Sequence, residues 1–295
     1  MKRTTRTLMG DMLQIANQLG IPHQILEHTT LNEKYSILAS QVPASGRPNV
    51  QYFVIGYGGH TGVVSPDNVV FTTSVDHYSS DQSLYKGIPF VMRLPGNDLT
   101  AAQRANYRLR NLVTNQRDGL QYIAYWAKPL NMANVTVSAK KIVRDASGTQ
   151  TSSDYVPDSS VLNPTAPGVS TNNVDQVVTS GTWLSAVAQL DLSLSPADCT
   201  ELLNVAQILF GDLQYALVSE YGLVSGIDVV ANGDTGQGPQ IQYTEVLAAQ
   251  ITDFLTNRGS GADDNDQGIP VIVNYGANEP LLASTAVANA TVVGS

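Results

Sequence analysis

Hydrophobic residues recur at helical spacing near the start of the chain. Leu8, Met12, Ile15 and Leu19 lie three or four positions apart, as side chains on one side of a helix do. This spacing predicts a helix over residues 5–19, and the Gly-Ile-Pro sequence that follows would end it.

Three later segments carry helix signals of different kinds. Asp98 can cap a helix over residues 98–110 by accepting hydrogen bonds from the free amides of its first turn. Ser195, with proline next and an acid three positions on, is typical of a capping box, and Gly211 would end that helix. A fourth helix is predicted over residues 243–257 from four apolar positions: Val246, Ala249, Ile251 and Leu255.

The remaining hydrophobic segments indicate β-strands. Most alternate apolar and polar residues, and turn residues bound them. The longest alternation covers residues 183–194, where the even-numbered positions from Leu184 to Leu194 would form the core face. About eight strands are predicted, over residues 50–55, 69–75, 88–94, 120–127, 135–143, 183–194, 215–224 and 269–275.

These elements define an α+β fold, rich in antiparallel sheets arranged in sandwich-like layers, with about four helices. No regular strand–helix–strand series is present, which argues against a doubly wound fold. We expect residues 1–143 to form an N-terminal helix and a β-rich subdomain, and residues 182–295 to form a C-terminal α+β subdomain. Residues 144–181 are rich in Ser, Thr, Asn and Pro and would be a loop, a linker or a docking arm.

The composition favours a protein whose surfaces become buried against neighbours. Charged residues make up 14% of the 295 residues, against about 25% in an average soluble protein. Uncharged polar side chains cost less to remove from water, and interface cores are depleted in charge. A plain soluble protein with a neutral polar surface is the alternative.

The net charge of −9 and the scarcity of Lys and Arg argue against a nucleic-acid partner. The N-terminal residues Lys2, Arg3 and Arg6 are the exception, because no acid precedes Asp11. They could contact phosphate or an acidic partner, or they could be a solvated tail.

Three arginines are further interface candidates. Arg104, Arg108 and Arg110 lie at the end of the predicted helix 98–110, where their guanidinium groups could pair with carboxylates of a neighbouring chain. Ordinary pairing within the chain is the alternative.

The motifs that would indicate enzymatic chemistry are incomplete. The glycine-rich residues 56–62 lack the lysine or final glycine of a phosphate loop, so we expect a hairpin or an interface loop there. The acidic residues 263–268 resemble part of a calcium loop, but Asn274 stands where that loop needs a glutamate. The four histidines form no metal motif, and the single cysteine, Cys199, is predicted to be a small buried helix residue. We therefore expect no catalytic, cofactor or metal site and no small-molecule substrate.

The N-terminus does not have the pattern of a signal peptide, and no apolar run approaches the roughly 20 residues needed to cross a membrane. We expect no membrane partner.

Several stretches, in order along the chain, resemble virion structural proteins of tailed bacteriophages, and in particular the baseplate wedge subunits of contractile tails. They include Gly87-Ile-Pro-Phe-Val-Met-Arg93 and Tyr122-Ile-Ala-Tyr-Trp-Ala127, and the full set covers residues 20–35, 87–110, 122–127, 210–228 and 243–251. The resemblance implies a non-enzymatic subunit that assembles in the host cytoplasm, resides in the virion, and contacts other virion structural proteins and copies of itself.

Three other functions stay open on the sequence. A neck or head–tail connector subunit would have a similar composition. A receptor- or ligand-binding attachment module would be favoured by exposed aromatic residues such as Tyr57 and Tyr155. An enzyme such as a cell-wall hydrolase would need acidic side chains that converge in a cleft.

Overall fold

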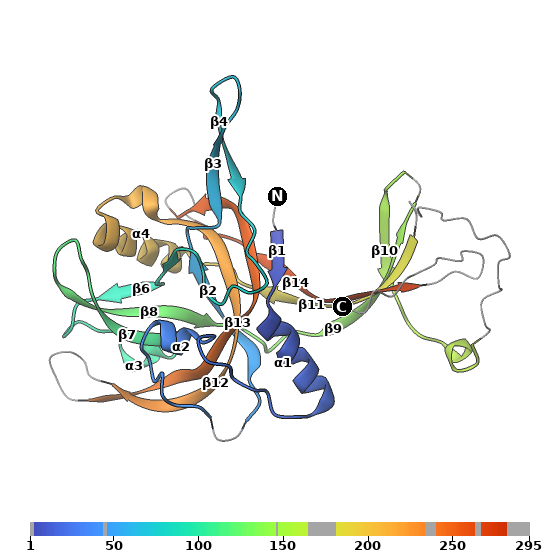
Figure 1. Ribbon diagram of the computed structural model, residues 1–295, viewed down its shortest axis with the longest axis horizontal. Helices are drawn as coiled ribbons and strands as arrows, with labels where there is room; N and C mark the ends of the chain where they lie inside the picture. The colour runs from blue at the N-terminus through green and yellow to red at the C-terminus, as the bar shows by residue number, and fades with distance from the viewer. Residues whose placement is uncertain are drawn as a thin grey trace. The chain divides into compact units, whose positions relative to one another are not determined.

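The structure, a computed structural model, describes residues 3–43, 46–145, 147–164, 181–233, 240–262 and 267–281 (Figure 1). Two compact units are present, and each is built from two separate stretches of the chain. Unit 1 comprises Met1–Asn131 and Leu192–Val271, and unit 2 comprises Met132–Asp191 and Ile272–Ser295. All strand pairs in the described residues are antiparallel, which confirms the predicted β-rich α+β class.

The units divide the chain differently from the predicted subdomains. The chain passes between units after residues 131, 191 and 271, whereas the composition placed a single linker at 144–181. Residues 150–154 of that stretch are a strand, and residues 165–180 lie outside the described residues. Because sheet pairing joins distant segments, a local change in composition does not mark where a unit begins.

Unit 1 is organised around an eight-stranded sheet. Its main path runs β1-β13-β12-β2-β8-β6, with β5 paired to β2 and β7 paired to β8. The strands are β1 Arg3–Arg6, β2 Asn49–Gly56, β5 Gly87–Ile88, β6 Val91–Arg93, β7 Arg108–Thr114, β8 Gln121–Pro129, β12 Leu217–Gly233 and β13 Ile241–Gly261.

The helices pack around this sheet: α1 and α2 contact β13, and α4 contacts β6 (Figure 1). Thr7 caps α1 by accepting from the Gly10 amide, and Ser195 and Asp198 form the predicted capping box of α4. Among the described residues, no helix is long and apolar enough to cross a membrane. The helices are α1 Leu8–Leu19, α2 Leu31–Lys34, α3 Ala101–Arg104 and α4 Pro196–Phe210, with 3-10 turns η1 Ser159–Leu162 and η2 Leu213–Tyr215.

The core of unit 1 lies where the central strands meet α2 and the segment after it. Fully buried side chains include Tyr52, Val224 and Ile251. The rings of Tyr35 and Trp126 pack against this cluster and stack on each other, with their centroids 4.4 Å apart.

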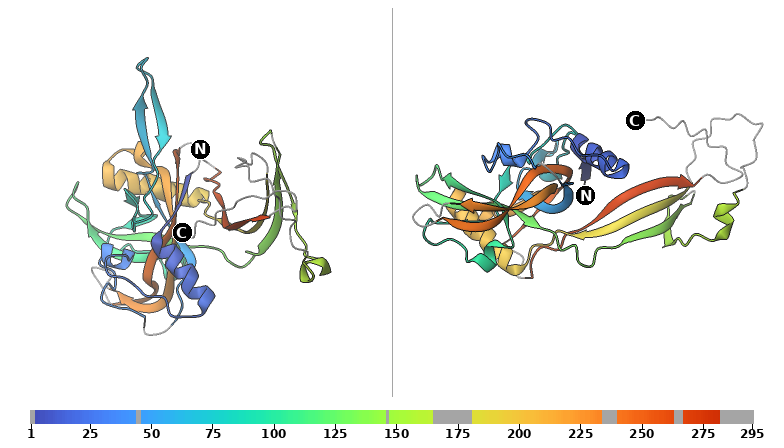
Figure 2. Two further views of the ribbon diagram at one scale, coloured as in Figure 1. Left: turned by 45° about the vertical axis from the view of Figure 1, so that its right-hand side comes forward. Right: turned by 90° about the horizontal axis from the view of Figure 1, so that it is seen from below.

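Unit 2 is a four-stranded sheet in the order β10-β9-β11-β14, and β11 and β14 pair over ten residues (Figure 2). Most of its side chains are exposed or half-buried. The predicted core face of residues 183–194 holds only in part, since Ala188 and Leu190 are buried whereas Ala186 is exposed. The strands are β9 Val137–Arg144, β10 Gln150–Asp154, β11 Gly181–Asp191 and β14 Ile272–Leu281.

The predicted helix over residues 243–257 was wrong, because this segment lies within strand β13. Its alanine and leucine content favours a helix. However, β13 is covered on both faces, so Leu247, Ala248 and Thr252 are buried together with the expected apolar positions. Burial on both faces removes the alternating pattern that would identify a strand.

The predicted helix over residues 98–110 was also wrong. Thr100 and Gln103 form a capping box, but α3 lasts only one turn before strand β7 begins. Leu109 has a positive φ of 54°, which a helix does not allow. The buried Glu245 carboxylate accepts the amides of Leu109 (2.6 Å) and Arg110 (2.9 Å), so a residue on another strand fixes this conformation.

Candidate functional site

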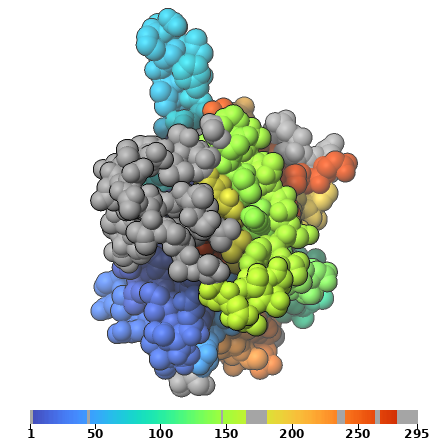
Figure 3. Space-filling model, turned by 90° about the vertical axis from the view of Figure 1, so that its right-hand side faces the viewer, coloured from blue at the N-terminus to red at the C-terminus, as the bar shows by residue number. Residues whose placement is uncertain are grey.

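A two-stranded hairpin carries one of two exposed apolar surfaces of unit 1. Strands β3 (His60–Val64) and β4 (Val70–Ser74) pair only with each other, and the hairpin stands clear of the rest of unit 1 (Figures 1 and 3). Five large apolar side chains near its tip are between 44% and 69% exposed: Val63, Val64, Val69, Val70 and Phe71.

The pairing register places apolar side chains on both faces of the tip. Val63 lies opposite Phe71, and Val64 lies opposite Val70. Because directly opposed residues share a face and neighbouring pairs alternate, neither face is polar. Monomeric proteins seldom keep such a contiguous apolar patch in water, which indicates an interaction surface.

The local sequence closes the turn at this tip. The Ser65 amide donates to Val69 O (2.9 Å), and the Asn68 amide donates to Ser65 O (3.0 Å). Asn68 adopts a positive φ of 57°, a conformation that asparagine tolerates better than most residues. Ser-Pro-Asp-Asn between two valine-rich runs is a recognisable hairpin signal, although a strand was predicted only over residues 69–75 and not over β3.

A buried carboxylate fixes the base of the hairpin. Glu220 on β12 is fully buried, and its Oε1 accepts the amides of Gly58 (2.9 Å) and Lys86 (2.8 Å). Its Oε2 accepts the Tyr85 amide and lies 3.1 Å from His77 Nε2. Four donors therefore satisfy this buried carboxylate, as burial of a charge requires.

His77 completes this anchor from the other side of the hairpin. Its ring is stacked between Tyr85 and Phe254, with centroid distances of 4.0 Å and 3.7 Å. Its Nδ1 lies 2.9 Å from Asp81 Oδ2, so each ring nitrogen faces a carboxylate oxygen. A ring nitrogen that carries a proton donates it to the carboxylate that it faces. The side chains of His77 and Glu220 have no exposed surface. This arrangement suits a structural clamp better than a site that a substrate must reach.

The strands enter and leave the hairpin through further contacts at the same base. The Gly59 amide donates to Ser219 Oγ (3.0 Å), and the Val75 amide donates to Gly59 O (2.9 Å). A Cβ atom at position 59 would lie 2.3 Å from Ser219 O, so only glycine permits this close approach. The amides of Gly58 and Gly59, considered from the sequence for phosphate binding, are thus used within the chain.

Helix α1 presents a second exposed apolar surface. The side chains predicted as a helical stripe are not the ones that pack on the sheet, since Met9, Leu13 and Ala16 are buried instead. The exposed stripe comprises Leu8, Ile15, Leu19 and the following Ile21, each about half exposed or more, at 49% to 66%. Exposed apolar rows on a helix are typical of surfaces that receive another chain.

The structure places Arg108 and Arg110 inside unit 1. Arg108 is buried and pairs through two bonds of 2.8 Å with Asp228, which also accepts the Tyr52 hydroxyl. Burial would raise the pKa of Asp228, but the hydrogen bonds from Arg108 and Tyr52 outweigh it and lower that pKa. Pairing within the chain, the alternative considered from the sequence, is the geometry observed here.

The other candidate cations also have partners within the chain. Asp98 lies 3.1 Å from Arg110 Nη2 and 3.6 Å from Arg104 Nη1. Arg3 pairs with Asp76 and Arg6 with Asp11, and all four of these side chains keep exposed surface. Lys2 lies outside the described residues.

The remaining sequence candidates are the possible metal ligands, Cys199, Tyr57, Tyr155 and the acidic cluster. No group of three or more His, Cys, Asp or Glu side chains in the part of the chain that the structure describes could hold a metal ion. Cys199 is buried on α4, as predicted, and burial raises its pKa. Tyr57 packs edge-on against Phe210, and Tyr155 is half-buried. Residues 263–266 of the acidic cluster lie outside the described residues.

The chain belongs to a protein family of unknown function, DUF7208, whose model matches residues 1–290. No curated protein and no solved structure shows significant similarity to it.

Proposed function

We propose that this chain is a non-enzymatic structural subunit of a tailed-phage virion, placed in the tail baseplate as a wedge component. The resemblance of residues 20–35, 87–110 and three further stretches to such subunits supports the phage assignment. The observation that carries the assembly role is the exposed apolar β3–β4 hairpin with its buried polar anchor. A neck or head–tail connector position is the second candidate.

The buried anchor of Glu220 and His77 suits the hairpin to docking. An isolated two-stranded hairpin is marginally stable in water. Here the Glu220 carboxylate accepts the Gly58 amide before the hairpin and pairs with the His77 ring after it, which fixes both ends of the hairpin at its base. A partner that covers the tip would therefore bind a preorganised element and lose little additional conformational entropy.

The size of the tip argues for an assembly with several contacts. Full burial of a valine or phenylalanine side chain is worth about 1.5–3 kcal/mol. Since the five tip residues are about half exposed, covering them contributes on the order of 5 kcal/mol. Association costs about 4–15 kcal/mol, so the hairpin alone would bind weakly. Additional surfaces such as the α1 stripe, or repetition of one contact around a symmetry axis, would make the assembly stable.

The first test compares a hairpin variant with a matched control. Val64→Thr with Val70→Thr keeps two β-branched residues in the strands while making one face of the tip polar. Val230→Thr is the control, because Val230 lies on strand β12 and is 69% exposed, as Val70 is. Light scattering over a concentration series should show oligomers for the wild type and the control. Association of the double variant should be weaker by about tenfold or more.

The second test locates the protein. An antiserum against the chain, used for immunogold electron microscopy of purified particles of the source phage, should label the baseplate. Label at the neck would select the second candidate. Unlabelled particles, together with a wild-type chain that stays monomeric at every concentration, would contradict the proposed function.

A further inference from the structure

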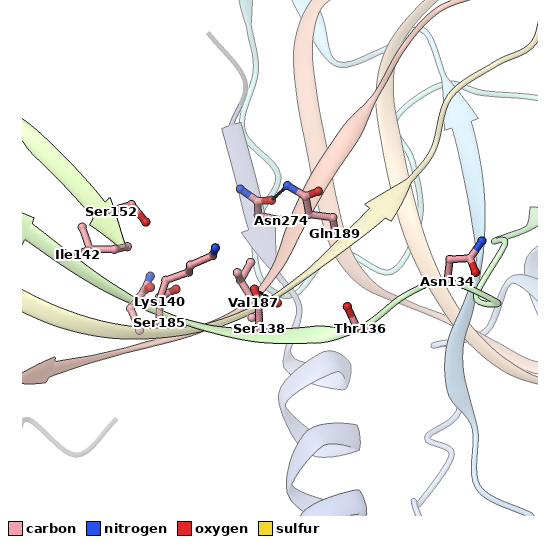
Figure 4. A pocket seen from close by; sticks show the side chains of 12 residues that line it. Asn134, Thr136, Ser138, Lys140, Ile142, Ser152, Ser185, Val187, Gln189 and Asn274 are labelled. Atoms are coloured by element: carbon pink, nitrogen blue, oxygen red, sulfur yellow. Dashed lines mark hydrogen bonds between the residues drawn. The ribbon is translucent and has the colours of Figure 1, made fainter. Parts of the chain in front are cut away.

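One face of the unit 2 sheet is a polar concavity of about 600 Å³ (Figure 4). This volume lies within the range of about 300–1,000 Å³ that is typical of ligand sites. Every second residue of β9, β11 and β14 contributes to it, so the lining side chains share one face of the sheet.

The lining is composed mainly of amides and hydroxyls. Only two of its twelve residues, Ile142 and Val187, are aliphatic. The amides belong to Asn134, Gln189, Asn274 and Asn278, and the hydroxyls to Thr136, Ser138, Ser152 and Ser185.

The opposite face of the same sheet has a different composition. Val137, Ala139, Leu184, Ala186 and Ala188 lie on it together with Lys141 and Glu279, because they alternate with the lining residues. A protein neighbour would be expected on this more apolar face, since interface cores are rich in apolar and aromatic side chains. The polar face therefore calls for a different kind of occupant.

The polar groups of the concavity are available to a ligand. Gln189 Nε2 donates to Asn274 Oδ1 at 3.4 Å, which is a long and weak contact (Figure 4). Within the described part of the chain, the side chains of Asn134, Ser152 and Asn278 make no hydrogen bond. Gly276 lies opposite Val187 and adds no side chain to the lining, and a Cβ atom there would lie only 1.9 Å from Ala186 O.

The charges around the concavity argue for an uncharged ligand. Among the described residues that line it, Lys140 is the only charged one, and its ammonium group pairs with Asp154 on the neighbouring strand. A nucleic acid or a phosphorylated ligand would need unpaired cations. An extended peptide would be bound through the backbone of a sheet edge and not through side chains of its face.

We propose that this face of unit 2 binds a neutral, hydroxyl-rich oligosaccharide. Sugar hydroxyls both donate and accept hydrogen bonds, as do the amides and hydroxyls that line the concavity. The lined part of strand β9, residues 138–142, spans roughly 13 Å, which is long enough for more than one sugar ring. The half-buried Trp183 lies opposite Ile142 on the same face and offers a flat ring on which a sugar can stack. This site does not depend on the proposed assembly role.

The test uses the full chain and four neutral probes: maltohexaose, cellohexaose, N-acetylchitohexaose and mannohexaose. Isothermal titration calorimetry with saccharide concentrations up to about 10 mM would detect Kd values near 1 mM, which correspond to a binding free energy of about −4 kcal/mol. At least one probe should bind. Asn274→Ala with Asn278→Ala should weaken that binding by about tenfold or more, since two amides are lost.

Ser153→Ala is the matched control, because Ser153 is exposed on the opposite face of β10, next to the lining residue Ser152. It should bind as the wild type does, and a heparin hexasaccharide should not bind. Failure of all four neutral probes, stronger binding of the anionic probe, or unchanged binding by the Asn274/Asn278 double variant would overturn the proposal. The hairpin variant Val64→Thr/Val70→Thr should keep its saccharide binding, which separates this site from the proposed assembly role.

Discussion

The sheets of units 1 and 2 share antiparallel pairing but place their polar side chains differently. In unit 1, Glu220, Glu245 and Thr252 point into the protein and are buried among apolar residues. In unit 2, Asn274, Asn278 and their neighbours line a solvent-facing concavity. The buried polar groups fix loops and strand conformations, whereas the exposed ones remain available for recognition. The role of a polar residue in a strand thus depends on whether its side of the sheet is covered.

The two tryptophans allow this comparison to be measured. Trp126 belongs to unit 1 and Trp183 to unit 2, and the chain has no others. Trp183→Phe makes fluorescence report on unit 1, and Trp126→Phe makes it report on unit 2. Urea unfolding of each background would then follow one unit at a time.

The largest effect should come from removing the buried carboxylate of unit 1. Glu220→Ala leaves His77 and three backbone amides without their acceptor. We expect a loss of about 3–5 kcal/mol in the free energy of unfolding, as for other broken buried pairs. Glu279→Ala, at an exposed position of β14, should change it by less than about 0.5 kcal/mol. Equal effects of the two substitutions would remove the distinction between the sheets.

The second prediction concerns pH. Burial raises the pKa of Glu245 to about 7, against the hydrogen bonds from three backbone amides and the nearby charge of Arg108. Between the unfolded pKa, near 4.5, and about 7, the folded state binds more protons, so the stability of unit 1 falls as pH rises. The contribution of this group is about 3 kcal/mol, at 1.36 kcal/mol per pKa unit.

Glu245→Gln removes this titration. Between pH 4.5 and 7.5, the free energy of unfolding of the wild type should fall by about 3 kcal/mol more than that of the variant. Urea unfolding in the Trp183→Phe background at both pH values measures the difference. A slope identical to that of the wild type would show that Glu245 is not the group responsible.

The smallest effect compares the same substitution in both sheets. Ile251 is fully buried in unit 1, and Ile142 is half-buried in unit 2. Ile251→Val should cost about 0.5–1.5 kcal/mol, because it leaves a cavity in a packed core. Ile142→Val should cost less than about 0.5 kcal/mol, since solvent or a small rearrangement fills the space. Each value is read in the fluorescence background of its own unit, and a larger loss at Ile142 would mean that the unit 2 face is more tightly packed than its exposure indicates.

Local signals in the sequence predicted several elements well. Ser195 and Asp198 determine where α4 begins, because a capping box needs only residues of one turn. The apolar run of residues 50–55 likewise lies in β2, and the spacing after Leu8 lies in α1. The exposed hairpin could also have been predicted, since its turn and flanking valines are contiguous.

The sites of interest were harder to predict, because their partners are far apart in the chain. Three closely spaced arginines suggested an interface, but Arg108 pairs with Asp228, 120 residues away. His77 and Glu220 are 143 residues apart, and nothing near either residue indicates that they meet. The lining of the unit 2 concavity likewise combines β9 with β14, which no local pattern connects.

The sequence by itself determined the α+β class, the end of α1 at Gly20, both ends of α4 and the shortage of charge, because these depend on composition or on neighbours within one turn. It did not determine the start of α1, which was predicted at residue 5, where strand β1 lies instead. Only the tertiary structure decided that residues 243–257 form a strand and that residues 98–110 turn into β7 after one helical turn. In both segments, burial against strands distant in sequence outweighs a helix preference that amounts to only a few tenths of a kcal/mol per residue.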